Sequence, residues 1–243
     1  MLKIINCQGT HVMTNKIIYI TLVLFAFSAP SFSAPSGGSA GPSNDSYNSQ
    51  PRKSKEQIAV ERYQKGLKAR DRAWKYEEQA LTESNEKKQQ KLLKKAQKQY
   101  KTAQKNYKRA LKTIANAYEI HTDLGYAYRK TGEYELSLAS YDEALRLQPA
   151  YTEAIEYRGE AFLGLNRLDD VKTSYMVLFR NDREKADILM KAIQQWIATA
   201  ADNNNVSEAA KSEFSAWASE RIQLNQQSLD LSPEATNPWN AAT

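Results

Sequence analysis

Residues 118–151 follow a helix–turn–helix pattern that limits what this chain can fold into more than any other feature. One expected helical face carries Leu124, Gly125 and Tyr128, where a small residue allows close packing and a large aromatic fills the gap beside it. Gly132 then breaks the helix. A second face follows in steps of four and three, and a proline closes the unit: Ser137, Tyr141, Ala144 and Pro149.

The same pattern recurs 34 residues later, over 152–185. The aligned positions are Gly159 for Gly125, Phe162 for Tyr128, Leu168 for Tyr134, Val171 for Ser137, Tyr175 for Tyr141 and Leu178 for Ala144. Three positions depart from the first copy, since Arg158 replaces the leucine, Asn166 the turn glycine and Arg183 the closing proline. Asparagine tolerates the left-handed backbone conformation, so a turn is still expected at Asn166.

These two units resemble the tetratricopeptide repeat, whose 34-residue pattern is W-x2-L-G-x2-Y followed by G, A, F or Y, A and P. The resemblance implies an all-α fold, a TPR-like α-solenoid of stacked helix–turn–helix repeats. It also implies a protein that binds other proteins and carries out no chemistry. Two repeats bury too little surface to be stable alone, so the flanking segments are expected to supply further helices.

Both flanks predict helices. Residues 53–117 predict an antiparallel helical hairpin that turns near 83–86, and residues 186–227 predict two capping helices. In the second hairpin helix, apolar residues alternate by three and four: Leu93, Ala96, Tyr100, Ala103, Tyr107, Ala110, Ile114 and Ala117. In the first, the apolar residues Val60, Leu67, Trp74 and Leu81 recur every seven. A strict seven-residue period leaves a coiled coil open, and 84–117 also fits a degenerate repeat.

The resemblance places the binding surface on the first helix of each repeat, which in tetratricopeptide proteins lines a concave groove that holds peptides. Position by position, the candidate partner-binding residues are Thr122, Tyr126, Arg129, Lys130, Glu153, Glu156, Tyr157 and Glu160. The first helix of the second repeat carries Glu153, Glu156 and Glu160 on one face, which favours a basic or mixed ligand. Ordinary solvated glutamates are the alternative. The Lys, Arg and Asn of a chaperone carboxylate clamp are missing, since Thr122 and Tyr126 stand there.

Charge divides the chain into two halves. Residues 52–113 hold 20 Lys and Arg against 7 Asp and Glu, hence +13, whereas residues 114–243 hold 12 against 20, hence −8. The basic half predicts an anion-binding face formed by Lys91, Lys94, Lys95, Lys98, Lys101 and Lys105. A solvated lysine face is the alternative. We also consider that the basic helix 86–113, from the same or a neighbouring chain, covers the glutamates of the groove.

The N-terminus predicts an export signal over 1–33, because Lys16 precedes the short apolar run 17–27 and small residues follow. Cleavage is expected near Ser33, and an uncleaved membrane anchor is the alternative. Ser, Gly and Pro in 34–52 indicate a flexible linker, and 228–243 indicates a disordered tail. Cys7 is the only cysteine, so the mature chain has no disulfide. The signal predicts a bacterial, periplasmic protein, and a eukaryotic secretory origin is the alternative, because the two kinds of signal look similar.

Catalysis is not expected. Of the two histidines, His11 lies in the export signal and His121 stands where the repeat packs a tryptophan. The mature chain therefore has no Cys–His pair and no His/Cys metal cluster, and a Ser–His–Asp set would have only His121 to use. No cofactor or small-molecule substrate is implied. Nucleic acid is not expected as a partner, because an exported protein rarely meets it and because Tyr100 and Tyr107 fall on the apolar stripe, away from the lysines.

The sequence therefore predicts a non-enzymatic adaptor of the cell envelope that binds a peptide or helix of another protein, or of itself. The alternative is a structural envelope protein. In that case the basic hairpin binds an anionic membrane or wall polymer while the repeats oligomerise.

Overall fold

The structure is a computed structural model that describes residues 52–200 and 203–230. The predicted export signal and most of the predicted linker and tail lie outside these residues. The helices of the described part are α1 Lys55–Thr82, α2 Glu86–Leu111, α3 Tyr118–Lys130, α4 Tyr134–Leu147, α5 Thr152–Gly164, α6 Leu168–Asn181, α7 Arg183–Thr199 and α8 Glu208–Asp230. No strand occurs among these residues, which confirms the all-α class. None of the described helices is long and apolar enough to cross a membrane.

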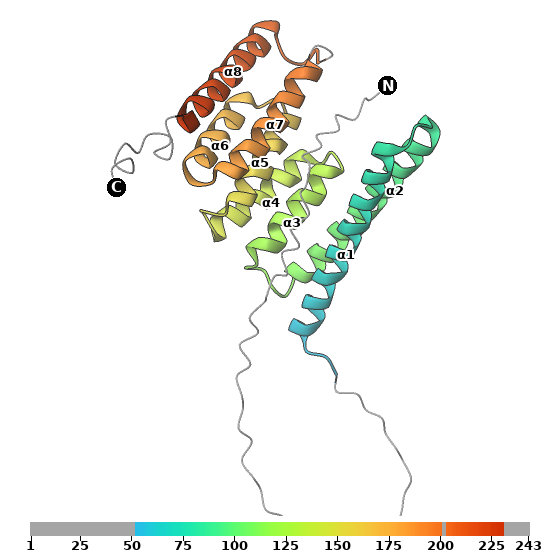
Figure 1. Ribbon diagram of the computed structural model, residues 1–243. Coiled ribbons are helices and arrows are strands. Elements are labelled where there is room, and N and C mark those ends of the chain that lie inside the picture. The colour runs from blue at the N-terminus through green and yellow to red at the C-terminus, as the bar shows by residue number, and fades with distance from the viewer. Residues whose placement is uncertain (1–51, 201–202, 231–243) are drawn as a thin grey trace, which may run out of the picture. The chain divides into compact units, whose positions relative to one another are not determined.

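The helices stack in chain order, from the α1–α2 hairpin at one end to α8 at the other (Figure 1). The first helices α3, α5 and α7 contact one another in turn, and α4 and α6 pack against the helices that precede and follow them. Helix α8 follows α7, and its Phe214 ring meets the Trp196 ring edge-on at a centroid distance of 5.5 Å. This is the nearest-neighbour packing of a helical-repeat solenoid.

The long helices α1 and α2 form an antiparallel hairpin. Ser54 begins α1 with a capping box to Gln57, and the Asn85 side chain caps α2. The predicted stripe of α2 is its buried face, since Ala96, Tyr100, Ala103, Tyr107 and Ala110 are at most 2% exposed. The short connection between the two helices and their many mutual contacts place them side by side as a hairpin.

The seven-residue seam predicted for α1 is correct only in part. Leu67 and Trp74 are partly buried and pack against the core, but Leu81 is 60% exposed. The fully buried positions lie one residue earlier and carry small residues: Ala59, Gly66, Ala73 and Ala80. Small residues are needed because α2 presents tyrosine rings: a Cβ on Gly66 would come within 2.3 Å of the Tyr107 ring. Close approach of small residues therefore outweighs the burial of the larger apolar ones.

Helices α3–α4 and α5–α6 occupy the two predicted repeats. Gly125 lies against the Tyr141 ring, where a Cβ would come within 2.6 Å, and the Ser137 hydroxyl donates to the Gly125 carbonyl at 2.8 Å. The backbone φ is 81° at Gly132 and 59° at Asn166. The predicted left-handed turn at Asn166 is thus confirmed.

Candidate functional site

The first helices α3, α5 and α7 are joined by charged side chains, which we call the charge cluster: Arg129, Glu156, Glu160 and Lys185. Arg129 of α3 forms an ion pair with Glu160 of α5. Glu156, one turn earlier on α5, lies 3.4 Å from the Lys185 ammonium of α7. Glutamates four residues apart share a helix face, so α5 offers one carboxylate to each neighbouring helix.

The charge cluster is buried. The side chains of Arg129 and Glu160 are 7% and 4% exposed, and that of Glu156 is 2% exposed. Two of its atoms, Arg129 Nε and Glu156 Oε1, are buried without a hydrogen-bond partner. Since buried polar atoms are nearly always satisfied, these two atoms are exceptions within the charge cluster.

Burial controls the ionisation of Glu156. Removal from water raises the pKa of this carboxyl well above its usual value, and the neighbouring Glu160 carboxylate raises it further. Lys185 and Arg129 act in the opposite direction and do not cancel the effect. The protonated form of Glu156 is therefore favoured over a wider pH range than for an exposed glutamate.

Aromatic rings extend the charge cluster towards α1. The Tyr126 ring lies 5.1 Å from the Tyr157 ring and 6.0 Å from the Trp74 ring of α1. The Trp74 indole donates a hydrogen bond of 2.8 Å to the Tyr126 hydroxyl. The Arg129 guanidinium lies 5.1 Å from the Tyr126 ring, within the range of cation–π attraction. Cluster and rings together form one surface along α1, α3, α5 and α7, which we call the first-helix surface.

Helix α1 supplies ion-pair partners to this surface. Arg70 of α1 lies 2.7 Å from Asp123 of α3, and Glu77 of α1 lies 2.9 Å from Lys130. Burial raises the pKa of Asp123, against the opposing effect of the Arg70 charge. The hairpin therefore interacts with the first repeat by charge pairing as well as by apolar packing.

The structure brings all eight predicted groove residues onto the first-helix surface, but not as an open lining. Thr122, Tyr126, Arg129, Glu156, Tyr157 and Glu160 are buried, and Lys130 and Glu153 are half-buried. The alternative of ordinary solvated glutamates is wrong for Glu156 and Glu160. Whether these residues bind a partner remains a prediction.

Sequence reasoning missed Asp123 on α3 and the partners that other helices supply: Arg70, Trp74 and Lys185. No signal in the sequence indicated Lys185, because it is the last position of the second predicted repeat, whereas in the structure it lies in α7. For Arg70 and Trp74 the sequence offered a charge and an apolar repeat, and neither indicates contact with α3 some 50 residues later.

The six predicted anion-binding lysines lie on α2, and all are exposed. None of them forms an ion pair with another described residue. Glu160 pairs instead with Arg129 and Glu156 with Lys185. The hypothesis that helix 86–113 covers these glutamates within the same chain is therefore wrong.

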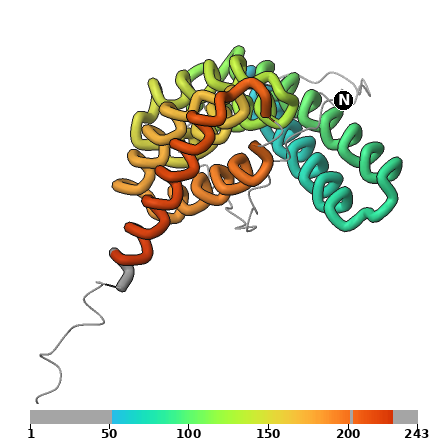
Figure 2. The backbone as a smooth tube through the Cα atoms, turned by 90° about the horizontal axis from the view of Figure 1, so that it is seen from above, coloured from blue at the N-terminus to red at the C-terminus, as the bar shows by residue number. Residues whose placement is uncertain are grey.

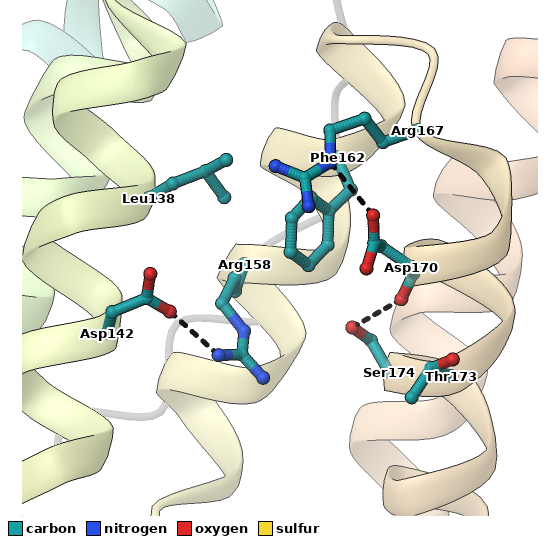
Figure 3. A pocket seen from close by; sticks show the side chains of 8 residues that line it. All are labelled: Leu138, Asp142, Arg158, Phe162, Arg167, Asp170, Thr173 and Ser174. Carbon is teal, nitrogen blue, oxygen red and sulfur yellow. Dashed lines mark hydrogen bonds and ion pairs between the residues drawn. The ribbon is translucent and has the colours of Figure 1, made fainter.

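A separate pocket of about 260 Å³ lies between α4, α5 and α6 (Figure 3). It is lined by Leu138, Asp142, Arg158, Phe162, Arg167, Asp170, Thr173 and Ser174. Its two arginines are already paired, Arg158 with Asp142 and Arg167 with Asp170, each at 2.8 Å. With its charges balanced internally, the pocket indicates no ligand. Among the described residues, no group of His, Cys, Asp and Glu could hold a metal ion.

Comparison with known proteins agrees with this geometry. Residues 125–166 match the family model of the TPR repeat. This segment runs from α3 through α4 and α5 and contains most of the charge cluster. The TPR repeat is thereby supported in this chain, and no catalytic family is indicated.

One similar solved structure is described as the first TPR of Spaghetti (RPAP3) bound to the HSP90 peptide SRMEEVD. It is 21% identical to this chain, the match covers 54% of this chain and 95% of that one, and the TM-score is 0.39. At that TM-score the similarity says nothing about what this chain binds. A search of curated proteins finds no match.

Proposed function

We propose that this protein is a non-enzymatic adaptor that binds a peptide or helix of another protein on its first-helix surface. The observation that carries the proposal is the charge cluster, which joins α3, α5 and α7 and lies largely within the segment that matches the TPR repeat. The first-helix surface carries tyrosine, tryptophan and arginine side chains. These residue types contribute most of the binding energy in protein interfaces.

The ligand would carry a positive charge. Glu156 and Glu160 bring two carboxyl groups together on α5, and Lys185 lies 3.4 Å from only one oxygen of Glu156. A lysine or arginine of the partner would form an ion pair with Glu156 and favour the ionised form of its carboxyl group. Lys130 and Glu153, which are half-buried, form the accessible edge by which such a segment would enter.

We also place the adaptor outside the cytoplasm, in the cell envelope. This rests on the sequence of residues 1–33, which lie outside the described residues. Intact-mass analysis of the protein purified from its native cells tests it: a mature chain beginning at Ala34 supports export, and a chain that retains residues 17–27 contradicts cleavage.

Site-specific photo-crosslinking in cells tests the binding surface. A crosslinking amino acid at Glu153 or Lys130 should capture one defined protein, whereas the same amino acid at Leu136 of α4, which is 50% exposed, should not. The nearly isosteric change Glu156→Gln should reduce the capture several-fold without unfolding the chain. Equal capture from Leu136, or capture that Glu156→Gln leaves unchanged, would contradict the proposal, and capture of this chain alone would indicate self-association.

A further inference from the structure

A row of lysines runs along α2 for most of its length, and we call it the lysine row. Its members alternate in steps of four and three residues: Lys87, Lys91, Lys94, Lys98, Lys101, Lys105 and Lys108. Such steps keep side chains on one face of a helix, and all seven are exposed. From first to last the row is about 32 Å long at ~1.5 Å per residue.

The lysine row points away from the rest of the fold. The opposite face of α2 carries the alanines and tyrosines that pack on α1, such as Ala96, Tyr100 and Ala103. Figure 2 shows the tip of the hairpin, where α1 ends and α2 begins, extending beyond the repeat helices. The first half of the row therefore lies on a part of α2 that only α1 supports.

The lysine row is not neutralised. In the part of the chain that the structure describes, none of its seven members takes part in an ion pair. The half-buried cations of the repeats differ, since each of them forms an ion pair, as Lys172 does with Glu213 at 2.9 Å and Arg158 does with Asp142 at 2.8 Å. Like charges three and four residues apart destabilise an isolated helix, so the row lowers helix stability unless an anion meets it.

The chemistry of the row disfavours a single bound anion, a protein interface and insertion into a membrane. Lysine presents a mobile point charge rather than the planar fork of arginine, which does not favour recognition of a single carboxylate or phosphate in fixed geometry. None of the large hydrophobic side chains that are exposed in the described chain lies on α2. Protein interfaces and membrane-inserted helices both rely on such anchors.

We propose that α2 binds a linear polyanion, a polymer that repeats phosphate or carboxylate groups along its length. A straight row of evenly spaced point charges matches a chain of evenly spaced anions, and release of the polymer's counterions drives the association without any apolar contact. This site is independent of the first-helix surface, because the lysines and the charge cluster lie on different helices and share no contact.

The test measures binding of the full chain to polyphosphate of about 20 units as a function of salt. With ~0.7 counterions released per contact, as for single-stranded polyanions, seven contacts give a log–log slope of about −5. Doubling the salt concentration should then weaken binding roughly 30-fold. The variant Lys91→Gln/Lys94→Gln/Lys98→Gln/Lys101→Gln should reduce the slope to about −2, so that the same doubling weakens binding only about 4-fold.

The matched control makes the same charge change on α1: Lys55→Gln/Lys65→Gln/Lys68→Gln/Lys75→Gln, all at exposed positions. The control should keep the wild-type slope, and circular dichroism should show equal helix content in both variants. Three results would overturn the proposal: no binding to polyphosphate at low salt, an equal loss in the control, or binding to vesicles of anionic lipid but not to polyphosphate. The last would assign the row to a lipid surface.

Discussion

Replacing Arg129 by methionine tests whether the charge cluster is buried in solution. The change keeps an unbranched side chain of similar length but removes the cation that pairs with Glu160. Glu160 would then remain 4% exposed with no opposite charge bonded to it. Because an unpaired buried charge bears the full cost of leaving water, the loss should far exceed that of a surface ion pair.

The expected cost is about 3–5 kcal/mol of unfolding free energy, the range for breaking one partner of a buried pair. For a folded region of this size that corresponds to a melting temperature lower by roughly 6–20 °C. The internal control is Arg146→Met, whose ion pair with Glu143 is 63% and 36% exposed. That change should leave the unfolding free energy nearly unchanged, because an exposed ion pair contributes little to stability.

Chemical denaturation of the two variants and of Arg129→Met/Glu160→Leu distinguishes the explanations. Removing both charges should recover most of the stability, since a buried pair replaced by apolar side chains is often neutral or stabilising. The reasoning is refuted if Arg129→Met costs as little as Arg146→Met, because the pair would then be solvated. A double variant that is stable yet loses the crosslinked partner would show that the charges are kept for binding rather than for folding.

Four further substitutions test the packing and the titration. Gly66→Ala should cost about 1–3 kcal/mol in denaturant unfolding because of the close Tyr107 ring, whereas Tyr107→Phe should cost nothing or stabilise, since the Tyr107 hydroxyl is buried without a partner. Asn166→Ala should cost about 2 kcal/mol by calorimetry, because the left-handed backbone is strained and the Trp196 indole loses its acceptor. For Glu156 the folded pKa is raised above the value of 4.5, so stability should fall by up to ~1.4 kcal/mol per pH unit as pH rises from 4.5 towards the folded pKa. Glu156→Gln should abolish that decline and raise stability at neutral pH, and an unchanged pH profile would contradict it.

The helices themselves were predictable from local pattern. Steps of three and four marked the buried face of α2, and turn chemistry marked both repeat turns, since only Gly132 and Asn166 have positive φ among the described residues. These features depend on residues close in sequence, where backbone geometry relates spacing directly to position on a face.

Contacts between helices were less predictable. For α1 the large apolar residues Val60 and Leu81 indicated the wrong buried face. Their hydrophobicity does not show how large the side chains of the facing helix are. Tyrosines on α2 require small residues opposite, which selects Ala59 and Gly66 instead. The packing interface between two helices depends on the side chains of both, so the sequence of one helix alone does not determine it.

The ion pairs of the structure change the interpretation of the two oppositely charged halves of the sequence. The sequence gives the basic half +13 and the acidic half −8, but in the repeats many charges of both signs are paired at short range, as Arg129 is with Glu160. A close pair acts as a dipole whose field falls off quickly, whereas the lysine row of α2 sums as charges of one sign. The field felt at a distance therefore comes mainly from α2. An anionic partner would be steered to the hairpin, and the first-helix surface would recognise its partner only at contact.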